Sequence, residues 1–195
     1  VAERTFSAFL VHVAERTESH TADECLANEA RNILVATCHL RTAVREEAHA
    51  YLERLVPAFP WLFARSDVVA TMLELTSLVG RGCDCELTNA FLPQYTYMST
   101  LAGISIDLSD QYAERRTLLD QVLGRVRDIL ARVQLDMPSE LHGSLMRYLH
   151  DEASSGSTII FATHYMEEAE GFADRIVLMA RGEIVADGSV DRIRA

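Results

Sequence analysis

The chain contains no lysine, and all 18 of its basic residues are arginine. A P-loop holds the phosphates of a nucleotide with glycine amides and one lysine, so this absence excludes a self-sufficient P-loop ATPase. Basic charge is scarce overall, because 29 acidic residues leave a formal net charge of −11. Nucleic acids and anionic lipid headgroups both attract basic surfaces, so we expect neither as a direct ligand.

Features of secreted and membrane-spanning proteins are also lacking. Four scattered cysteines are too few for a disulfide scaffold, which predicts reduced thiols and a cytoplasmic protein, peripheral at the plasma membrane only through partners. No apolar run approaches the ~20 residues that cross a bilayer, so we expect no membrane insertion. The first residues carry charges within the apolar stretch, unlike a secretory signal. Since the chain begins at Val1 rather than Met, we interpret it as a piece of a longer protein or a processed product.

The first three quarters of the chain have the apolar spacing of helices. Apolar side chains recur every three or four residues, as Phe6, Phe9, Leu10 and Val13 do. We expect Ser19 or Thr21 to cap the second helix. From Arg81 to Ile106 the periodicity fails, which predicts an irregular connection. The predicted helices are 1–16, 23–39, 41–55 (ending before Pro57), 66–78 (ended by Gly80 and Gly82), 108–130 (with a buried stripe Leu118, Leu119, Val122, Leu123, Val126, Ile129 and Leu130) and 138–149.

The apolar period changes from that of a helix to that of a strand near Ser154–Ser157. The remainder predicts a strand, a helix, a strand, a tight turn, a strand and a helix start at Val190. We therefore predict a mainly α fold: an antiparallel, solenoid-like helical array over 1–149, followed by a small α/β fragment over 150–195. A fragment of under ~50 residues is marginal alone, so we expect the helical part to be the stable unit.

Residues 156–189 resemble the C-terminal end of an ABC transporter ATP-binding subunit. The apolar run Thr158–Ala162 precedes Thr163-His164, and Tyr165–Glu170 reads YMEEAE. Asp174-Arg175, an apolar strand and Arg181-Gly182 follow. The resemblance implies that His164 descends from the switch histidine that reaches the γ-phosphate of ATP, with ATP and Mg²⁺ as the cofactors of that family. Because no P-loop precedes it, we expect His164 to be vestigial, with no bound cofactor and no confident catalytic residue in the isolated chain.

Residues 51–149 resemble the helical region that precedes the catalytic domain in type III alpha phosphatidylinositol 4-kinases. The resemblance implies a scaffold that docks regulatory subunits, because none of that family's catalytic loop, activation segment or ATP-holding lysine falls within the chain. The residues that carry it are Phe59-Pro60-Trp61-Leu62, Val68–Leu75, Ile106–Arg116 and Ser144–Leu149.

Other reactive residues have simpler structural interpretations. Cys83, Cys85 and His39 match no zinc spacing. Leu135–Ser139 is similar to a Walker B strand end, but Met137 occupies the position of the catalytic glutamate and the preceding pattern is helical. The carboxylates Asp136, Glu140, Glu46, Glu47, Glu167, Glu168 and Glu170 are interpreted as solvated helix faces rather than acid–base pairs or metal ligands.

For two clusters of residues the sequence allows either a surface role or a packing role. Phe59, Pro60, Trp61 and Phe63 would form either an exposed docking patch or part of the core, and core packing is favoured. The arginines at 115, 116, 125 and 127 would form either a phosphoinositide site or surface ion pairs, and ion pairs are favoured.

Three hypotheses about function follow. The chain is a non-catalytic scaffold or interaction segment of the lipid-kinase kind, partnered by regulatory subunits. Alternatively it is a truncated ABC subunit that contributes His164 to the ATP site of a partner chain. A third alternative is a chimera without an evolved function. In each case we predict that the isolated chain neither hydrolyses ATP nor phosphorylates lipid.

Overall fold

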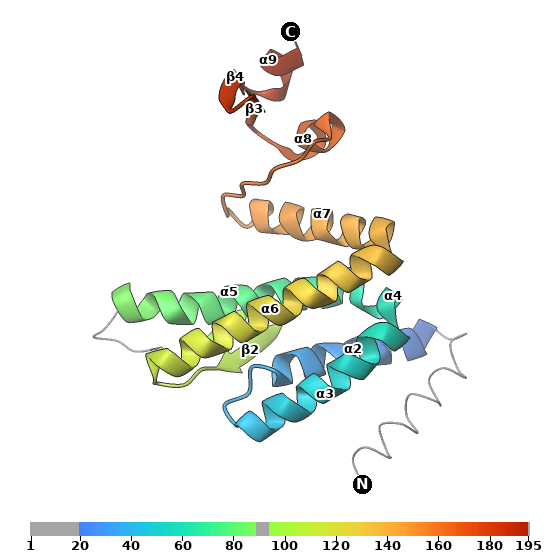
Figure 1. The fold of residues 1–195 in the computed structure, drawn as a ribbon, viewed down its shortest axis with the longest axis vertical. Coiled ribbons are helices and arrows are strands. Elements are labelled where there is room, and N and C mark those ends of the chain that lie inside the picture. The colour runs from blue at the N-terminus through green and yellow to red at the C-terminus, as the bar shows by residue number, and fades with distance from the viewer. Residues whose placement is uncertain (1–19, 89–93, 195) are drawn as a thin grey trace. The chain divides into compact units, whose positions relative to one another are not determined.

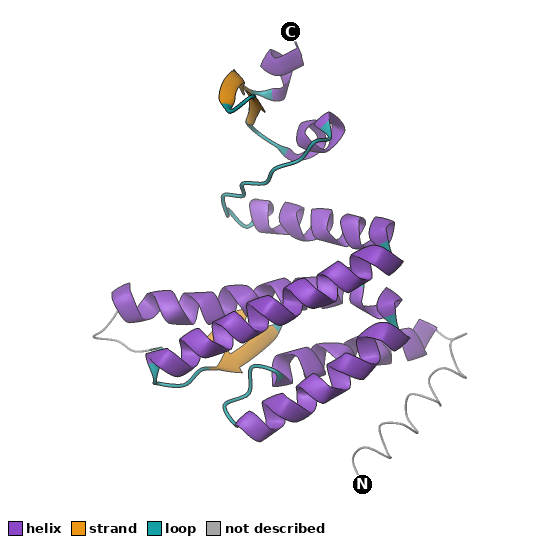
Figure 2. Ribbon diagram, in the orientation of Figure 1, coloured by secondary structure: helices purple, strands orange, loops and turns teal. Residues whose placement is uncertain are grey.

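The computed structural model describes residues 20–88 and 94–194, and the chain divides into two compact units, Val1–Tyr148 and Leu149–Ala195. The described residues of the first unit are helical apart from one small hairpin, whereas the second unit holds a second hairpin and short helices (Figures 1 and 2). The predicted fold, mainly α with a small α/β tail, is confirmed. The helix predicted over 1–16 lies outside the described residues. None of the described helices is long and apolar enough to span a membrane.

Helices α2 (His20–Ala36) and α3 (Thr42–Ala58) lie side by side, joined by a short turn (Figure 1). The predicted cap at Thr21 is wrong, because the helix has already begun at His20; Ser19 lies outside the described residues. The predicted end before Pro57 is also wrong, since α3 includes Pro57 and ends one residue later. A proline removes a single helical hydrogen bond, and little helix remains after Pro57 to be disrupted.

Helix α5 (Ser66–Thr88) follows the short α4 (Pro60–Phe63) and contradicts the predicted stop at Gly80 and Gly82. Cys83 and Cys85 are therefore helical rather than in a loop. A Cβ added at Gly82 would overlap Leu108 Cδ1, so this glycine permits close packing inside a continuing helix. Glycine ends a helix when it adopts a left-handed conformation, and Gly82 has no positive φ.

The connection predicted to be irregular contains a β-hairpin. Strands β1 (Thr96–Ser99) and β2 (Ile104–Asp107) are antiparallel, with Thr96 opposite Asp107 and Ser99 opposite Ile104. Alternate residues are buried, among them Tyr97 and Ile106. Each strand has only four residues, too few for the alternation to be recognised without the helices it packs against.

Helix α6 (Tyr112–Asp136) packs along α5, and α7 begins at Pro138 as predicted but continues to Ser154. The predicted stripe on α6 is confirmed except at Leu123, which is 49% exposed. The aromatic cluster belongs to the core, as predicted, since Phe59 and Phe63 are buried and Trp61 packs against the hydrophobic core.

The second unit contains α8 (Met166–Phe172), the antiparallel strands β3 (Ile176–Ala180) and β4 (Glu183–Gly188), and α9 (Val190–Arg194). The hairpin turns at Arg181 and Gly182, both with positive φ, as a tight two-residue turn requires. The strand predicted over Thr158–Ala162 is not formed. A strand requires a hydrogen-bonded neighbour, and among the described residues of this unit β3 and β4 pair only with each other.

Candidate functional site

His164 lies on an irregular segment directly before α8, and its side chain is exposed. The Thr163 hydroxyl accepts a hydrogen bond from the Tyr165 main-chain N–H at 3.0 Å, which turns the chain into that helix. In the absence of a strand at Thr158–Ala162, no sheet edge directs the imidazole toward a ligand. Glu170 on α8 forms an ion pair with Arg194, which holds the pKa of its carboxyl below the ordinary value. His164 lines neither the groove between α3 and α6 nor the groove beside His39 and Arg115.

The cysteines and His39 are separated by the fold. Cys83 and Cys85 lie on α5, whereas His39 lies in the turn after α2 and its Nδ1 accepts a hydrogen bond from the Arg41 N–H. No three His, Cys, Asp or Glu side chains converge for a metal ion within the described ranges. Burial raises the pKa of the Cys83 thiol, and raises that of Cys38 to about 11. Both are protonated thiols at neutral pH and behave as apolar core residues.

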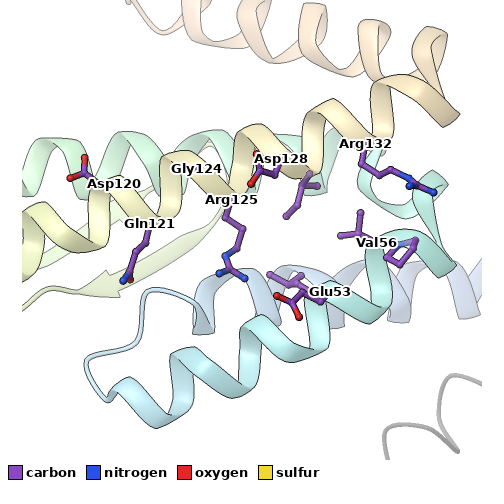
Figure 3. A pocket seen from close by; sticks show the side chains of 11 residues that line it. Glu53, Val56, Asp120, Gln121, Gly124, Arg125, Asp128 and Arg132 are labelled. Atoms are coloured by element: carbon purple, nitrogen blue, oxygen red, sulfur yellow. The ribbon is translucent and has the colours of Figure 1, made fainter.

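The four arginines considered above as a basic patch lie in different environments and do not form one site. Arg115 is buried and donates a hydrogen bond to the Ser109 carbonyl at 2.7 Å, which fixes the start of α6. Arg116 lies 3.9 Å from Asp120, and Arg127 lies 3.6 Å from Asp128. These two are exposed ion pairs of the predicted kind, each contributing little to stability. Arg125 differs, because it points from α6 toward α3 (Figure 3).

Arg125 lines an open groove of about 530 Å³ between α3 and α6, hereafter the α3–α6 groove (Figure 3). Both helices belong to the first unit. Along α3 the lining runs from Leu52 to Pro57, and along α6 from Asp120 to Arg132. The lining combines the apolar side chains of Leu52, Val56, Pro57 and Ile129, the carboxylates of Glu53, Asp120 and Asp128, the guanidinium groups of Arg125 and Arg132, and Gln121 and Gly124.

Buried polar atoms lie beside this groove. The Nε atom of Arg125 and the Nδ1 atom of His49, on α3, are buried with no hydrogen-bond partner among the described residues. Burial lowers the pKa of Arg125, whereas the charges of Glu53 and Asp128 raise it. Burial first, then the charges of Arg125 and Arg45, lower the pKa of His49 to about 4. At neutral pH His49 is uncharged, and Arg125 is a cation beside acidic groups.

A glycine and a proline on opposite walls affect the space and the hydrogen bonding of the groove. A Cβ added at Gly124, in the middle of α6, would meet no atom within 4 Å, so the glycine leaves open space in the groove. On the opposite wall Pro57 has no N–H to donate to the carbonyl of Glu53. The sequence alone does not reveal this groove, because its two walls are more than sixty residues apart in the chain. The available signals were Pro57 and Gly124, each of which interrupts a helical pattern.

Comparisons with known proteins divide along the same two resemblances. The chain is 27% identical over 136 residues to a phosphatidylinositol 4-kinase of Schizosaccharomyces pombe, which covers 70% of this chain and 7% of the kinase. It is 33% identical over 102 residues to a carnitine transport ATP-binding protein of Listeria monocytogenes, covering 45% of this chain and 26% of that protein. It is 44% identical over 48 residues to an energy-coupling factor transporter ATP-binding protein of Clostridium perfringens, covering 25% and 16% respectively.

The chain therefore spans only a small part of each of these relatives. No protein-family model matches the sequence. The shares of this chain matched by the kinase and by the carnitine transport protein add to more than its whole length, so the two similar stretches overlap. The chain is thus similar to a short section of a phosphatidylinositol 4-kinase and to a part of ABC transporter ATP-binding subunits.

Proposed function

We propose that this chain is a non-catalytic helical interaction segment, which binds other proteins through the α3–α6 groove. The observation that carries the proposal is the groove itself, an apolar floor with charged rims on two helices of the larger unit. The similarity to a phosphatidylinositol 4-kinase over 70% of the chain supports it, because the matched stretch is only 7% of that enzyme, too short a section to be a whole kinase. We place such a segment in the cytoplasm, reaching the plasma membrane through its partners.

We also propose that the isolated chain neither hydrolyses ATP nor phosphorylates lipid. This part of the proposal rests on the absence of lysine and on the exposed, irregular position of His164. Steady-state phosphate release with Mg-ATP, measured on the full chain and on His164→Ala, tests this part. We expect both proteins to match the buffer blank, and turnover that disappears in the His164→Ala protein would contradict the proposal.

Protein binding is tested with a photo-crosslinking amino acid placed in the full chain in its native cells. Gln121 lines the groove, and Gln134 is exposed on the same helix but does not line it. We expect a discrete protein crosslink from position 121 that is missing from position 134. Equal crosslinking from both positions would indicate nonspecific contact and would contradict a binding role for the groove.

A specific observation in the second unit supports a second candidate function. Met179 is 68% exposed and pairs across the hairpin with Ile184, which is 63% exposed, and the neighbouring Val185 is 61% exposed. Exposed apolar surface on a small sheet with free edges favours covering by another protein. With the similarity to ATP-binding subunits, this supports a tail that joins a P-loop-bearing chain and contributes His164 to its ATP site.

Mass photometry of the full chain with such a P-loop-bearing chain, with and without Mg-ATP, tests the second candidate. It predicts an ATP-dependent complex whose hydrolysis falls in the His164→Ala protein while association persists. Particles that stay monomeric at all ATP concentrations would contradict it.

A further inference from the structure

We infer that the α3–α6 groove binds an amphipathic helix of a partner protein, and that this helix carries lysine or arginine beside its apolar face. The inference rests on the proposed function and names the chemistry of the partner. Its first support is length. The lining of α6 extends from Asp120 to Arg132, which is about 18 Å of helix at ~1.5 Å per residue. That length matches about three turns of a bound helix, with anchors at three- and four-residue spacing.

The shape of the groove is the second support. Leu52 and Val56 lie one turn apart on α3, and Ile129 lies across from them on α6, so that apolar side chains form the floor. Gly124 lies in the wall, with open space where a side chain would be. A glycine inside a helix lowers stability relative to alanine, because its backbone loses more conformational freedom on folding. No atom of the described residues packs closely enough against Gly124 to need a glycine there. A partner helix that approaches closely would need one.

The hydrogen-bonding character of the rim is the third support. Glu53, Asp120 and Asp128 bring carboxylates to the groove, and the Glu53 carbonyl receives no N–H from Pro57. All of these groups are acceptors, so they favour a donor on the partner helix.

The arginines of the groove do not reverse this preference. Arg132 already donates to Asp136 at 3.0 Å. Burial lowers the pKa of Arg125, and the negative charges of Glu53 and Asp128 oppose that effect, so both carboxylates already act on its guanidinium. An anionic ligand would therefore meet more negative than positive charge. A second copy of this chain, with a net charge of −11 and no lysine, is a poor electrostatic match as well.

The test is fluorescence anisotropy of the full chain with a labelled synthetic helical peptide. The probe has leucine and alanine at positions i, i+3, i+4 and i+7 and lysine beside them, and its control has glutamate in place of every lysine. We expect the lysine peptide to bind at least about tenfold more tightly, with an affinity that falls as salt is added, because opposite charges across the rim are screened. Equal binding of the two peptides would overturn the inference.

Variants then locate the binding site. Gly124→Leu fills the groove, and Gly143→Leu is its matched control, because Gly143 is also inside a helix with open space around its Cβ but does not line the groove. We expect the first change to weaken peptide binding by about tenfold and the second to leave it within about twofold. Glu53→Gln, which removes one carboxylate and leaves Gly124 in place, should weaken the lysine peptide alone. Similar affinities for both glycine variants would overturn the inference.

The outcomes separate this inference from the proposed function. A partner crosslinked from Gln121, with no preference for the lysine peptide, would refute the basic helix and leave the interaction role intact. No crosslink and no peptide binding would refute both. Concentration-dependent dimers that disappear in the Gly124→Leu protein would assign the groove to a second copy of the chain and would also refute the basic helix.

Discussion

Gly124 lies in the middle of α6, and its replacement by alanine should stabilise the first unit. Alanine is favoured over glycine inside a helix by about 0.5–1 kcal/mol, because the glycine backbone loses more conformational freedom on folding. The new Cβ would meet no atom within 4 Å, so no steric cost offsets that gain. We expect the free energy of unfolding to rise by about that amount, which corresponds to a few degrees in the melting temperature.

Gly82→Ala is the matched comparison within α5. The helical preference for alanine is the same, but this Cβ would overlap Leu108 Cδ1 and lie 3.4 Å from Tyr97 Cε2. Leu108 is only 3% exposed, so it has little room to move. Overpacking of a core typically costs about 1–3 kcal/mol, which exceeds the gain in helical preference, and we expect a net loss of stability.

Urea unfolding followed by circular dichroism at 222 nm measures both changes. The opposite signs are the critical result, since both variants make the same chemical change in a long helix. A destabilised Gly124→Ala protein would show that the space beside α6 is filled in the native protein, and would refute the open groove. A stabilised Gly82→Ala protein would refute the close packing of the β1–β2 hairpin against α5.

Three further predictions concern buried groups. Tyr148→Phe removes the hydroxyl that donates to Glu74 Oε1 at 2.6 Å and should cost about 1–3 kcal/mol in urea unfolding, because a buried carboxylate loses a partner. The pKa of His49 is lowered to about 4, so the unfolded chain binds a proton that the folded chain does not, and stability should fall as pH falls from about 6.5 toward 4. Cys38, with its pKa raised to about 11 and 1% exposure, should resist iodoacetamide, whereas the exposed Cys25 should react first.

Each of these has its own control. His49→Gln should flatten the fall in unfolding midpoint over that pH range, and an unchanged profile would assign the fall to other groups. An unfolding free energy of Tyr148→Phe equal to that of the original protein would show that α7 does not depend on the contact with α5. If mass spectrometry shows that iodoacetamide labels Cys38 before Cys25, the buried position of Cys38 in the turn after α2 would be contradicted.

Local patterns in the sequence determined much of the helical part. The apolar spacing of Val122, Val126 and Ile129 predicted the buried stripe of α6, because residues three or four apart lie on the same face of a helix. Pro138 correctly predicted the start of α7, since proline fits the first turn of a helix. The absence of lysine predicts that the chain has no complete P-loop, because that site depends on one specific side chain, and this stays a prediction.

The tertiary structure decided the features that depend on distant neighbours. Gly82 lies inside a continuing helix, and Leu108, on a later segment, occupies the space of its missing side chain. Thr158–Ala162 has the composition of a strand but is not one, since in the described part of its unit β3 and β4 pair only with each other. The α3–α6 groove exists only where Pro57 and Gly124 face the same space from helices far apart in the chain. A sequence pattern records the preference of a residue for its own helix or strand, whereas a binding surface depends on which elements the fold brings together.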